Sequence, residues 1–152
     1  MIRGIGLTGD ITSAYFMPAK YQNFDYQVRM KRTGCASCGN GFLLRETTST
    51  VVYFRYTNSG YFYIYACNTI DCYDWKLPTY STAIIKGGFN VIRVVAINNL
   101  YKFYINNVLV NQGTASGSYA SYNKVGYVGV DFYSDKAAGN FLDVDYAILT
   151  KK

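Results

Sequence analysis

The sequence contains no histidine, and Glu46 is the only glutamate among its 152 residues. Without an imidazole the chain cannot assemble a Ser-His-Asp or Cys-His nucleophile, and metal sites that use histidine are excluded as well. A glycine-rich phosphate-binding loop is also missing. These absences remove many hydrolases, metalloenzymes and nucleotide-dependent enzymes from consideration, and we expect a protein that is not an enzyme.

Long apolar runs and helical periodicity are lacking too. No apolar stretch approaches the roughly 20 residues of a membrane-spanning helix, and no segment repeats its apolar residues with the period of a helix. Residues 1–4 have no apolar centre like that of a secretory signal. We therefore expect no membrane insertion and one domain over residues 1–152, with residues 1–9 as an N-terminal edge or boundary segment.

Aromatic residues, in contrast, are abundant. They make up 18% of the chain and include 17 tyrosines, while the formal net charge is +6. Because the lysines and arginines are scattered, the charge indicates solubility, with at most a weak preference for acidic polymers. Binding of nucleic acid would fit the charge, but the sequence has no basic groove motif, so we expect no nucleic-acid partner.

Residues 89–112 show the pattern around which the chain is organised. Two strand-length runs of β-branched and aromatic residues, 91–97 and 101–105, are joined at Asn98-Asn99, and the pair Asn106-Asn107 leads into a third run. Asparagine tolerates the positive φ that tight hairpin turns need. We predict a β-meander whose alternate residues line a core.

Similar runs occur along the rest of the chain. Further strands are predicted at residues 24–32, 41–46, 51–57, 61–66, 81–85, 125–133 and 141–149. Asn58-Ser59-Gly60 favours a hairpin turn, whereas residues 73–78, 114–123 and 135–140 are predicted as loops or turns. About eleven short strands with polar turns predict an all-β fold, an antiparallel two-sheet β-sandwich.

The order of these motifs resembles the concanavalin A-like and laminin G-like jelly rolls. The resemblance is carried by Asn90-Val-Ile-Arg-Val-Val-Ala, Leu100-Tyr-Lys-Phe-Tyr-Ile-Asn-Asn, Lys124-Val-Gly-Tyr-Val-Gly-Val, Phe141-Leu-Asp-Val-Asp-Tyr and the upstream runs that begin at Tyr26 and Gly41. It covers about residues 10–150, through order and spacing rather than any single motif. One departure is Asn107, where the family usually has glycine. The resemblance implies a fold shared with non-catalytic carbohydrate-binding modules, which hold ligands on the concave sheet or at the loop rim.

Four cysteines, Cys35, Cys38, Cys67 and Cys72, fall in predicted loops. A short disulfide within each loop would suit an exported chain, so we expect an extracellular or cell-surface location. The alternative is one Cys₄ zinc site, whose ligand spacing the first pair matches. A redox role would need the Cys-x-x-Cys at a helix start, and no such context is visible. Four cysteines permit three pairings, and the sequence leaves the connectivity open.

Tyr61, Tyr63 and Tyr65 alternate with apolar residues along the predicted strand 61–66. If the apolar residues point into the core, the tyrosines stand in a row on the opposite face, about 7 Å apart. Aromatic rings flanked by hydrogen-bonding groups suit the apolar faces and hydroxyl rims of a sugar chain. We therefore predict a glycan-binding face, and the candidates on adjoining strands are Arg45, Tyr53, Arg55, Tyr127, Asp131 and Tyr133.

Trp75, Tyr73 and Tyr80 are predicted as an aromatic rim beside this face. Packing alternatives stand beside both predictions. Tyrosine pairs across strands stabilise a sheet by about 0.2–1 kcal/mol without any ligand, and a lone tryptophan often caps a core. Arg45, in the same way, has Glu46 and Asp131 as candidate ion-pair partners.

Carboxylates offer two further roles. Asp143 and Asp145 lie two residues apart on a predicted strand, as a glycosidase pair could, although that position resembles the structural last strand of the family. Related jelly rolls often hold Ca²⁺ at a sheet edge, to which Asp10, Asp143 or Asp145 could contribute. Calcium needs about six to eight oxygen ligands and no local motif supplies them. We therefore predict ordinary surface acids, no metal site and no required cofactor.

The expected function is that of an extracellular, non-catalytic module that binds a polysaccharide or glycan, either alone or as one domain of a larger secreted or surface protein. The alternative is a structural or adhesion domain that makes protein-protein contacts in a surface assembly.

Overall fold

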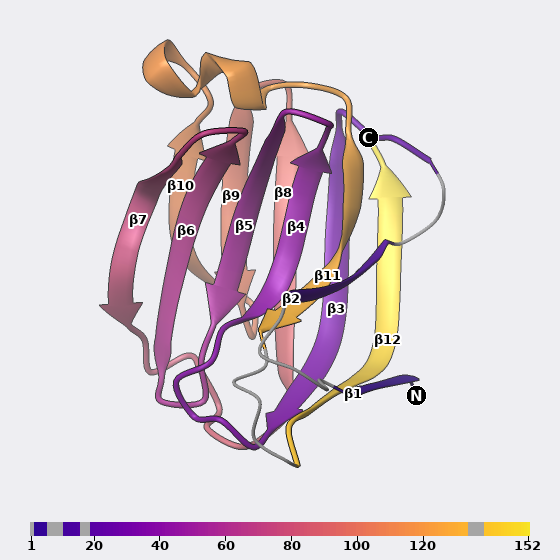
Figure 1. The fold of residues 1–152 in the computed structure, drawn as a ribbon, viewed down its shortest axis with the longest axis vertical. Coiled ribbons are helices and arrows are strands. Elements are labelled where there is room, and N and C mark those ends of the chain that lie inside the picture. Colours follow the sequence, from indigo (N-terminus) through magenta and orange to yellow (C-terminus); the bar gives the residue numbers. More distant parts are fainter. Residues whose placement is uncertain (1, 6–10, 16–18, 134–138) are drawn as a thin grey trace.

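The computed structural model describes the backbone of residues 2–5, 11–15, 19–133 and 139–152, and the side chains of residues 19–133 and 139–152. Two antiparallel six-stranded sheets pack face to face (Figure 1). The predicted fold class, an all-β two-sheet sandwich, is confirmed. Among the residues that the structure describes, none forms a helix with the length and apolar character that crossing a bilayer would need.

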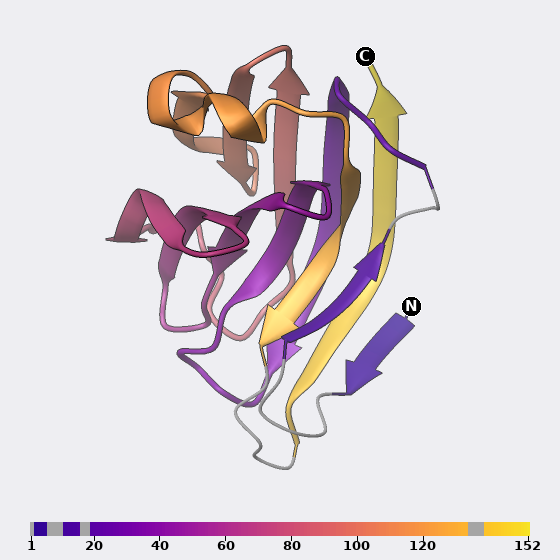
Figure 2. The same cartoon turned by 45° about the horizontal axis from the view of Figure 1, so that its top comes forward.

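Sheet A, the farther sheet in Figure 1, pairs its strands in the order β1 (Ile2–Ile5), β12 (Phe141–Lys151), β3 (Phe24–Thr33), β8 (Asn90–Ile97), β9 (Leu100–Ile105), β10 (Val108–Thr114). Sheet B, the nearer sheet, has the order β2 (Ile11–Tyr15), β11 (Tyr127–Tyr133), β4 (Asn40–Glu46), β5 (Thr50–Tyr56), β6 (Tyr61–Asn68), β7 (Cys72–Tyr80). A 3₁₀ helix, η1 (Gly117–Tyr122), lies near the end of the sandwich at the top of Figures 1 and 2.

The core fills the space between the sheets because alternate strand residues point to opposite faces. In β3 every second side chain from Phe24 to Arg32 is buried, and Phe54 of sheet B meets Phe103 of sheet A edge to face at 5.1 Å between ring centroids. Burying an aromatic or aliphatic side chain of this size stabilises the fold by about 1.5–3 kcal/mol. The predicted meander and its core face are confirmed by β8, β9 and β10.

The asparagine turns of the meander are also confirmed. Asn98 has φ 52°, and Asn106 and Asn107 have φ 49° and 67°. Two successive residues with positive φ match the twist of a two-residue hairpin, so asparagine at 107 does the work that glycine would do.

Two predictions of secondary structure are wrong. The predicted loop at residues 73–78 lies inside β7, which pairs with β6 through two register shifts and carries Pro78. An edge strand tolerates proline because one side of its backbone has no partner strand. The predicted strand at residues 81–85 is a turn. There the Asn90 side chain bonds both the N–H and the carbonyl of Ile85, in place of a neighbouring strand.

The two carboxylates of β12 do not form a pair. A register shift between Val144 and Tyr146 separates their environments: Asp143 is buried, whereas Asp145 is exposed and forms an ion pair with Arg29. Asp10 lies outside the residues described. In the described ranges no cluster of three or more acidic or cysteine side chains could hold a metal ion.

Candidate functional site

The outer face of sheet B carries a cluster of three tyrosines that we call the tyrosine platform: Tyr53, Tyr63 and Tyr65. Tyr53 and Tyr65 are direct partners across β5 and β6, and their rings stack at 4.7 Å. Tyr63 and Tyr65, two residues apart on β6, stack at 5.9 Å. All three side chains are partly exposed. Because the rings stack on one another, they form one continuous surface instead of standing apart along the strand.

A buried ion pair lies beside the platform. Arg55 donates from Nε to Asp131 Oδ2 at 2.8 Å, and its Nη2 bonds the same oxygen. The guanidinium carbon sits 4.6 Å from the Tyr53 ring centroid and 5.2 Å from that of Tyr65. The hydrogen bonds to Asp131 therefore fix the guanidinium, and the guanidinium supports the rings of Tyr53 and Tyr65 by cation–π contact.

Two glycines make room for this packing. A side chain at Gly39 would place Cβ 2.0 Å from the Tyr63 hydroxyl oxygen and 3.0 Å from Arg55 Cδ. Gly41 is the strand neighbour of both Arg55 and Asp131, and a Cβ there would meet backbone atoms of β5. The two glycines of Gly39-Asn40-Gly41 could have indicated close packing on this strand, but the prediction from the sequence did not use them.

Burial shifts the ionisation of these groups. It raises the pKa of Tyr53, Tyr63 and Tyr65, so their hydroxyls stay protonated and can both donate and accept hydrogen bonds. Burial alone would lower the pKa of Arg55, but the Asp131 carboxylate outweighs it and raises that pKa. Arg55 therefore keeps its charge throughout the ordinary pH range.

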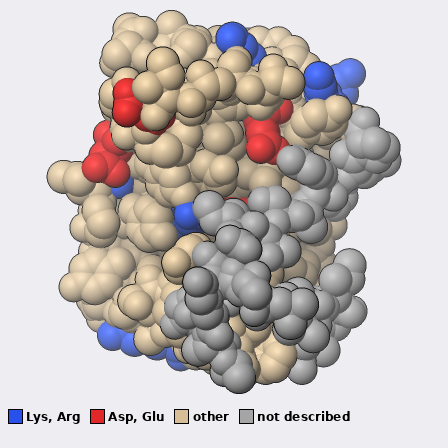
Figure 3. Space-filling model, in the orientation of Figure 1, with Lys and Arg blue, Asp and Glu red and all other residues tan. Residues whose placement is uncertain are grey.

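The surface over sheet B is mainly uncharged. In Figure 3, which shows this face, uncharged residues cover most of the surface that is drawn in colour; acidic groups lie at the left and in the upper middle, and a basic group lies near the middle. A neutral, aromatic and hydroxyl-rich surface suits a ligand that combines apolar faces with hydroxyl groups.

The prediction that Arg45 is exposed on this face is wrong. A bulge between β4 and β11 interrupts the strand alternation, and Arg45 there has φ 48° and is 1% exposed. Its guanidinium donates to the carbonyls of Gln22 and Asn98 and to Asn123 Oδ1 at 2.8 Å. Arg45 joins distant segments of the chain, and among the described residues neither Glu46 nor Asp131 forms an ion pair with it; Asp131 pairs with Arg55 instead.

Other predicted residues lie away from the platform. Tyr61 packs edge to face on Tyr80 at 5.6 Å, at the opposite end of β7 from Tyr73. Tyr80 follows Tyr73 by seven residues of strand, or about 23 Å, so Tyr73, Trp75 and Tyr80 do not form one rim. On β11, Tyr127 lies under the Lys20 ammonium at 5.1 Å, and Tyr133 is exposed at the strand end.

Trp75 packs against the core. Its ring meets Tyr101 and Phe103 edge to face at 5.3 and 6.2 Å and stacks on Tyr119 at 5.2 Å. Trp75 thus covers the gap between β7 and β10, as the packing alternative predicts.

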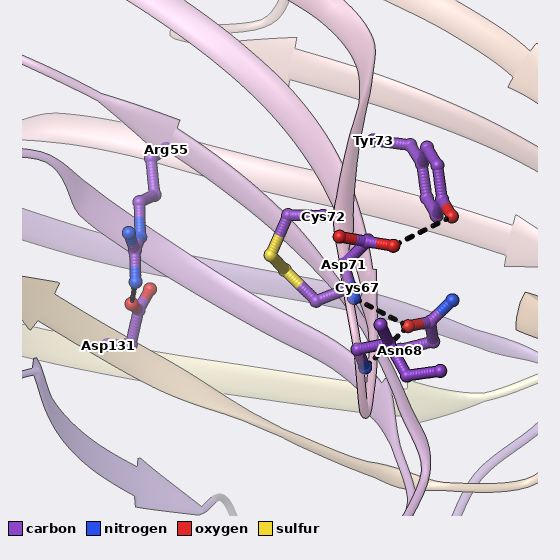
Figure 4. Close-up of a disulfide and its surroundings, with 8 residues drawn as sticks. Arg55, Cys67, Asn68, Asp71, Cys72, Tyr73 and Asp131 are labelled. Carbon is purple, nitrogen blue, oxygen red and sulfur yellow. Dashed lines mark hydrogen bonds and ion pairs between the residues drawn. A yellow bond between two sulfur atoms is a disulfide. The ribbon is translucent and has the colours of Figure 1, made fainter.

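Both predicted disulfides are present, and the zinc alternative is wrong. Cys35 bonds Cys38, and Cys67 bonds Cys72. The first bridge lies in a loop, as predicted. The second lies at the paired ends of β6 and β7, with 4.0 Å between the two Cα atoms, and closes that hairpin (Figure 4).

Comparison with known proteins relates this chain to others by fold alone. No family model and no curated protein matches it. Among solved structures, the carbohydrate binding module CBM66 from Bacillus subtilis superposes with a TM-score of 0.72 at 10% sequence identity, covering 95% of this chain and 97% of that one.

Two other similar structures are those of a glucanase and an agglutinin. A β-glucanase from Bacillus licheniformis matches with a TM-score of 0.70 at 10% identity, covering 89% of this chain and 69% of its own. CG-16, a homodimeric agglutinin from chicken liver, matches with a TM-score of 0.63 at 9% identity, covering 93% and 100%. The predicted fold, a concanavalin A-like jelly roll resembling carbohydrate-binding modules, is confirmed, and the fold does not by itself assign an activity.

Proposed function

We propose that this chain is an extracellular, non-catalytic carbohydrate-binding module that holds a polysaccharide or glycan on the tyrosine platform. The observation that carries the proposal is the platform itself: three stacked, partly exposed rings supported by a buried ion pair on the open face of a sheet. Rings fixed in advance lose little conformational freedom when a ligand binds, which favours affinity.

Two kinds of support come from outside the platform. A carbohydrate binding module and an agglutinin have similar folds. The non-catalytic role is supported by the state of Asp131, the carboxylate that pairs with Arg55 under the platform: it is 1% exposed and engaged by Arg55, so it does not reach a ligand on the rings. Glycoside hydrolysis normally needs two carboxylates that reach the substrate.

The extracellular location is supported by the two short disulfides, since such bonds persist in oxidising compartments. A role as one domain of a larger secreted or surface protein follows from the same proposal, because binding modules of this size act by bringing a partner domain to the polymer.

The test is binding to a panel of neutral and acidic polysaccharides, by affinity electrophoresis and then calorimetry. Tyr53→Ala and Tyr65→Ala are each expected to weaken binding about 5- to 10-fold, because one stacked ring contributes about 1–1.4 kcal/mol. Tyr104→Ala is the matched control, since Tyr104 packs under Arg93 at 5.5 Å on sheet A and should bind as the wild type does. Equal binding by all four proteins would refute the platform as the site.

The adhesion alternative is favoured by one observation, the exposed side chains of edge strand β7. Tyr73, Leu77 and Tyr80 are 48%, 65% and 52% exposed, and exposed aromatic and apolar side chains are of the kind that protein interfaces cover. If no polysaccharide binds and the chain self-associates in a way that Leu77→Lys abolishes, this alternative replaces the glycan proposal.

A further inference from the structure

A cavity lies where the hairpin between β6 and β7 meets η1, at the end of the sandwich and away from the tyrosine platform. Its volume is about 280 Å³ and it is lined by Asn68, Tyr73, Ser118, Tyr119, Ser121 and Tyr122. Four of these six residues belong to η1, in the predicted loop 114–123, for which the sequence predicted no function. Small-molecule sites in proteins begin at about 300 Å³, so this volume is close to their lower limit.

The cavity wall is held in place from both sides. On the η1 side, Tyr119 stacks on Trp75 with only 11° between the ring planes, and its hydroxyl donates to the Asp74 carbonyl at 3.1 Å. On the hairpin side, the Cys67–Cys72 disulfide closes the turn, and Asn68 Oδ1 accepts the N–H groups of residues 70 and 71, both at 2.8 Å. Such fixed walls suit a binding site, because little order has to be created on binding.

Polar groups that face the cavity are left without strong internal partners. Tyr122 as a whole is 3% exposed, but its hydroxyl is not among the enclosed polar atoms, and within residues 19–133 and 139–152 it makes no hydrogen bond. The Tyr73 hydroxyl has only a 3.5 Å contact to Asp71, which is long for a hydrogen bond. The Asn68 amide nitrogen points away from the turn that its oxygen stabilises. Figure 4 shows this nitrogen and the Tyr73 hydroxyl on the same side of the hairpin, directed away from Arg55 and Asp131.

The chemistry of the lining selects the ligand. The residues that line the cavity provide phenol, hydroxyl and amide groups, and the one carboxylate that contacts them is Asp71, at the Tyr73 hydroxyl; among the described residues a negatively charged ligand would therefore gain no counter-charge. Tyr73, Tyr119 and Tyr122 add aromatic faces. A small neutral molecule with several hydroxyl groups and an apolar face fits both properties, and the volume admits one sugar ring rather than a chain.

We propose that this cavity binds a single neutral sugar residue, at the end or on a side branch of a glycan. The proposal rests on the proposed function for its ligand class but not for its site, because the tyrosine platform and the cavity share no residue. The cavity would recognise a terminal unit, whereas the platform would follow a chain.

The experiment is a ¹H–¹⁵N NMR titration of the whole chain with the neutral methyl glycosides of glucose, galactose, mannose and N-acetylglucosamine. At least one glycoside is expected to shift the amide signals of residues 68–73 and 117–122. Tyr122→Phe and Tyr73→Phe should each weaken that glycoside about 3- to 10-fold, the effect of one lost hydrogen bond. Neither variant should disturb folding, because each removes a hydroxyl that lacks a strong internal partner; unchanged spectra of the free variants check this. Tyr104→Phe is the matched control.

The outcomes separate the two sites. Shifts that gather at the cavity and weaken in both variants support the proposal, whether or not the platform binds polysaccharide. Shifts confined to β5 and the middle of β6 would leave the platform standing and overturn the cavity. The proposal is equally overturned if no glycoside in the panel moves the cavity signals, or if both variants bind as the wild type does.

Discussion

Replacing Asp131 by asparagine is expected to lower the free energy of unfolding by about 3 kcal/mol. Arg55 is 6% and Asp131 1% exposed, so neither group can turn to water when its partner is lost. Removing one member of a buried ion pair costs about 3–5 kcal/mol, because the remaining charge stays in surroundings that solvate it poorly. The asparagine amide keeps one acceptor for the guanidinium, which places the expected loss at the lower end. For a domain of this size, the melting temperature should fall by about 6–12 °C.

A double-mutant cycle isolates the interaction from other effects of the substitutions. Arg55→Met and Asp131→Asn are made singly and together, and unfolding in urea is followed by circular dichroism and by the fluorescence of Trp75, the only tryptophan. The double variant should lose at least about 2 kcal/mol less than the sum of the single losses, since coupled neighbours deviate from additivity by up to about 3 kcal/mol. Losses that add within about 0.5 kcal/mol would refute the reasoning.

Three further outcomes are expected. Phe54→Ala should cost about 3–5 kcal/mol in urea unfolding, because this ring is fully buried between the sheets; a loss below 1 kcal/mol would contradict the core assignment. Replacing Cys67 and Cys72 by serine should lower the free energy of unfolding by about 2 kcal/mol, the chain entropy that a disulfide removes for so short a loop. In this variant a reducing agent should cause no further loss from that hairpin, as urea unfolding with and without the agent would show. The hydrogen bonds and charge of Arg93 hold the pKa of Asp25 below its usual 3.8, so the ionised form stabilises the fold above about pH 4 and this contribution disappears as the pH falls through the lowered pKa. Asp25→Asn should therefore lose under about 1 kcal/mol at pH 7 and progressively less as the pH is lowered through the acidic range, measured by urea unfolding at a series of pH values.

Strand alternation carried most of what could be predicted from the sequence. The period of two placed Phe62 and Ile64 in the core and Tyr63 and Tyr65 on the outer face, and the asparagine pairs fixed the hairpins. These signals are local, so each strand could be recognised without knowing its partner. That Tyr53 stacks on Tyr65 depends on the register between β5 and β6, which the predicted turn at residues 58–60 already indicated.

The failures come from contacts that are distant in sequence. Arg45 points inward because β4 accommodates an extra residue against β11, which lies about 80 residues later in the chain. The residues near Arg45 in the sequence do not indicate that bulge. β7 was mistaken for a loop because its partner β6 and the disulfide supply its order, while its own sequence contains proline. The cavity beside η1 was missed for the same reason: its walls join residues about 50 positions apart.

The pairing of the first strands with the last has a consequence for how the chain folds. β1 bonds to β12 and β2 bonds to β11, so neither sheet is complete until nearly the whole chain has left the ribosome. The hairpins β4–β5, β5–β6, β6–β7, β8–β9 and β9–β10 can form early, because their partners are adjacent. In contrast, β3 must wait for β8 and β12, and the second edge of β4 must wait for β11. Such distant pairings slow folding, because the chain loses the entropy of closing a long loop before the stabilising strand contacts form. A nascent chain therefore presents unpaired β3 and β4 edges for much of its synthesis, and that interval is when aggregation would compete with folding.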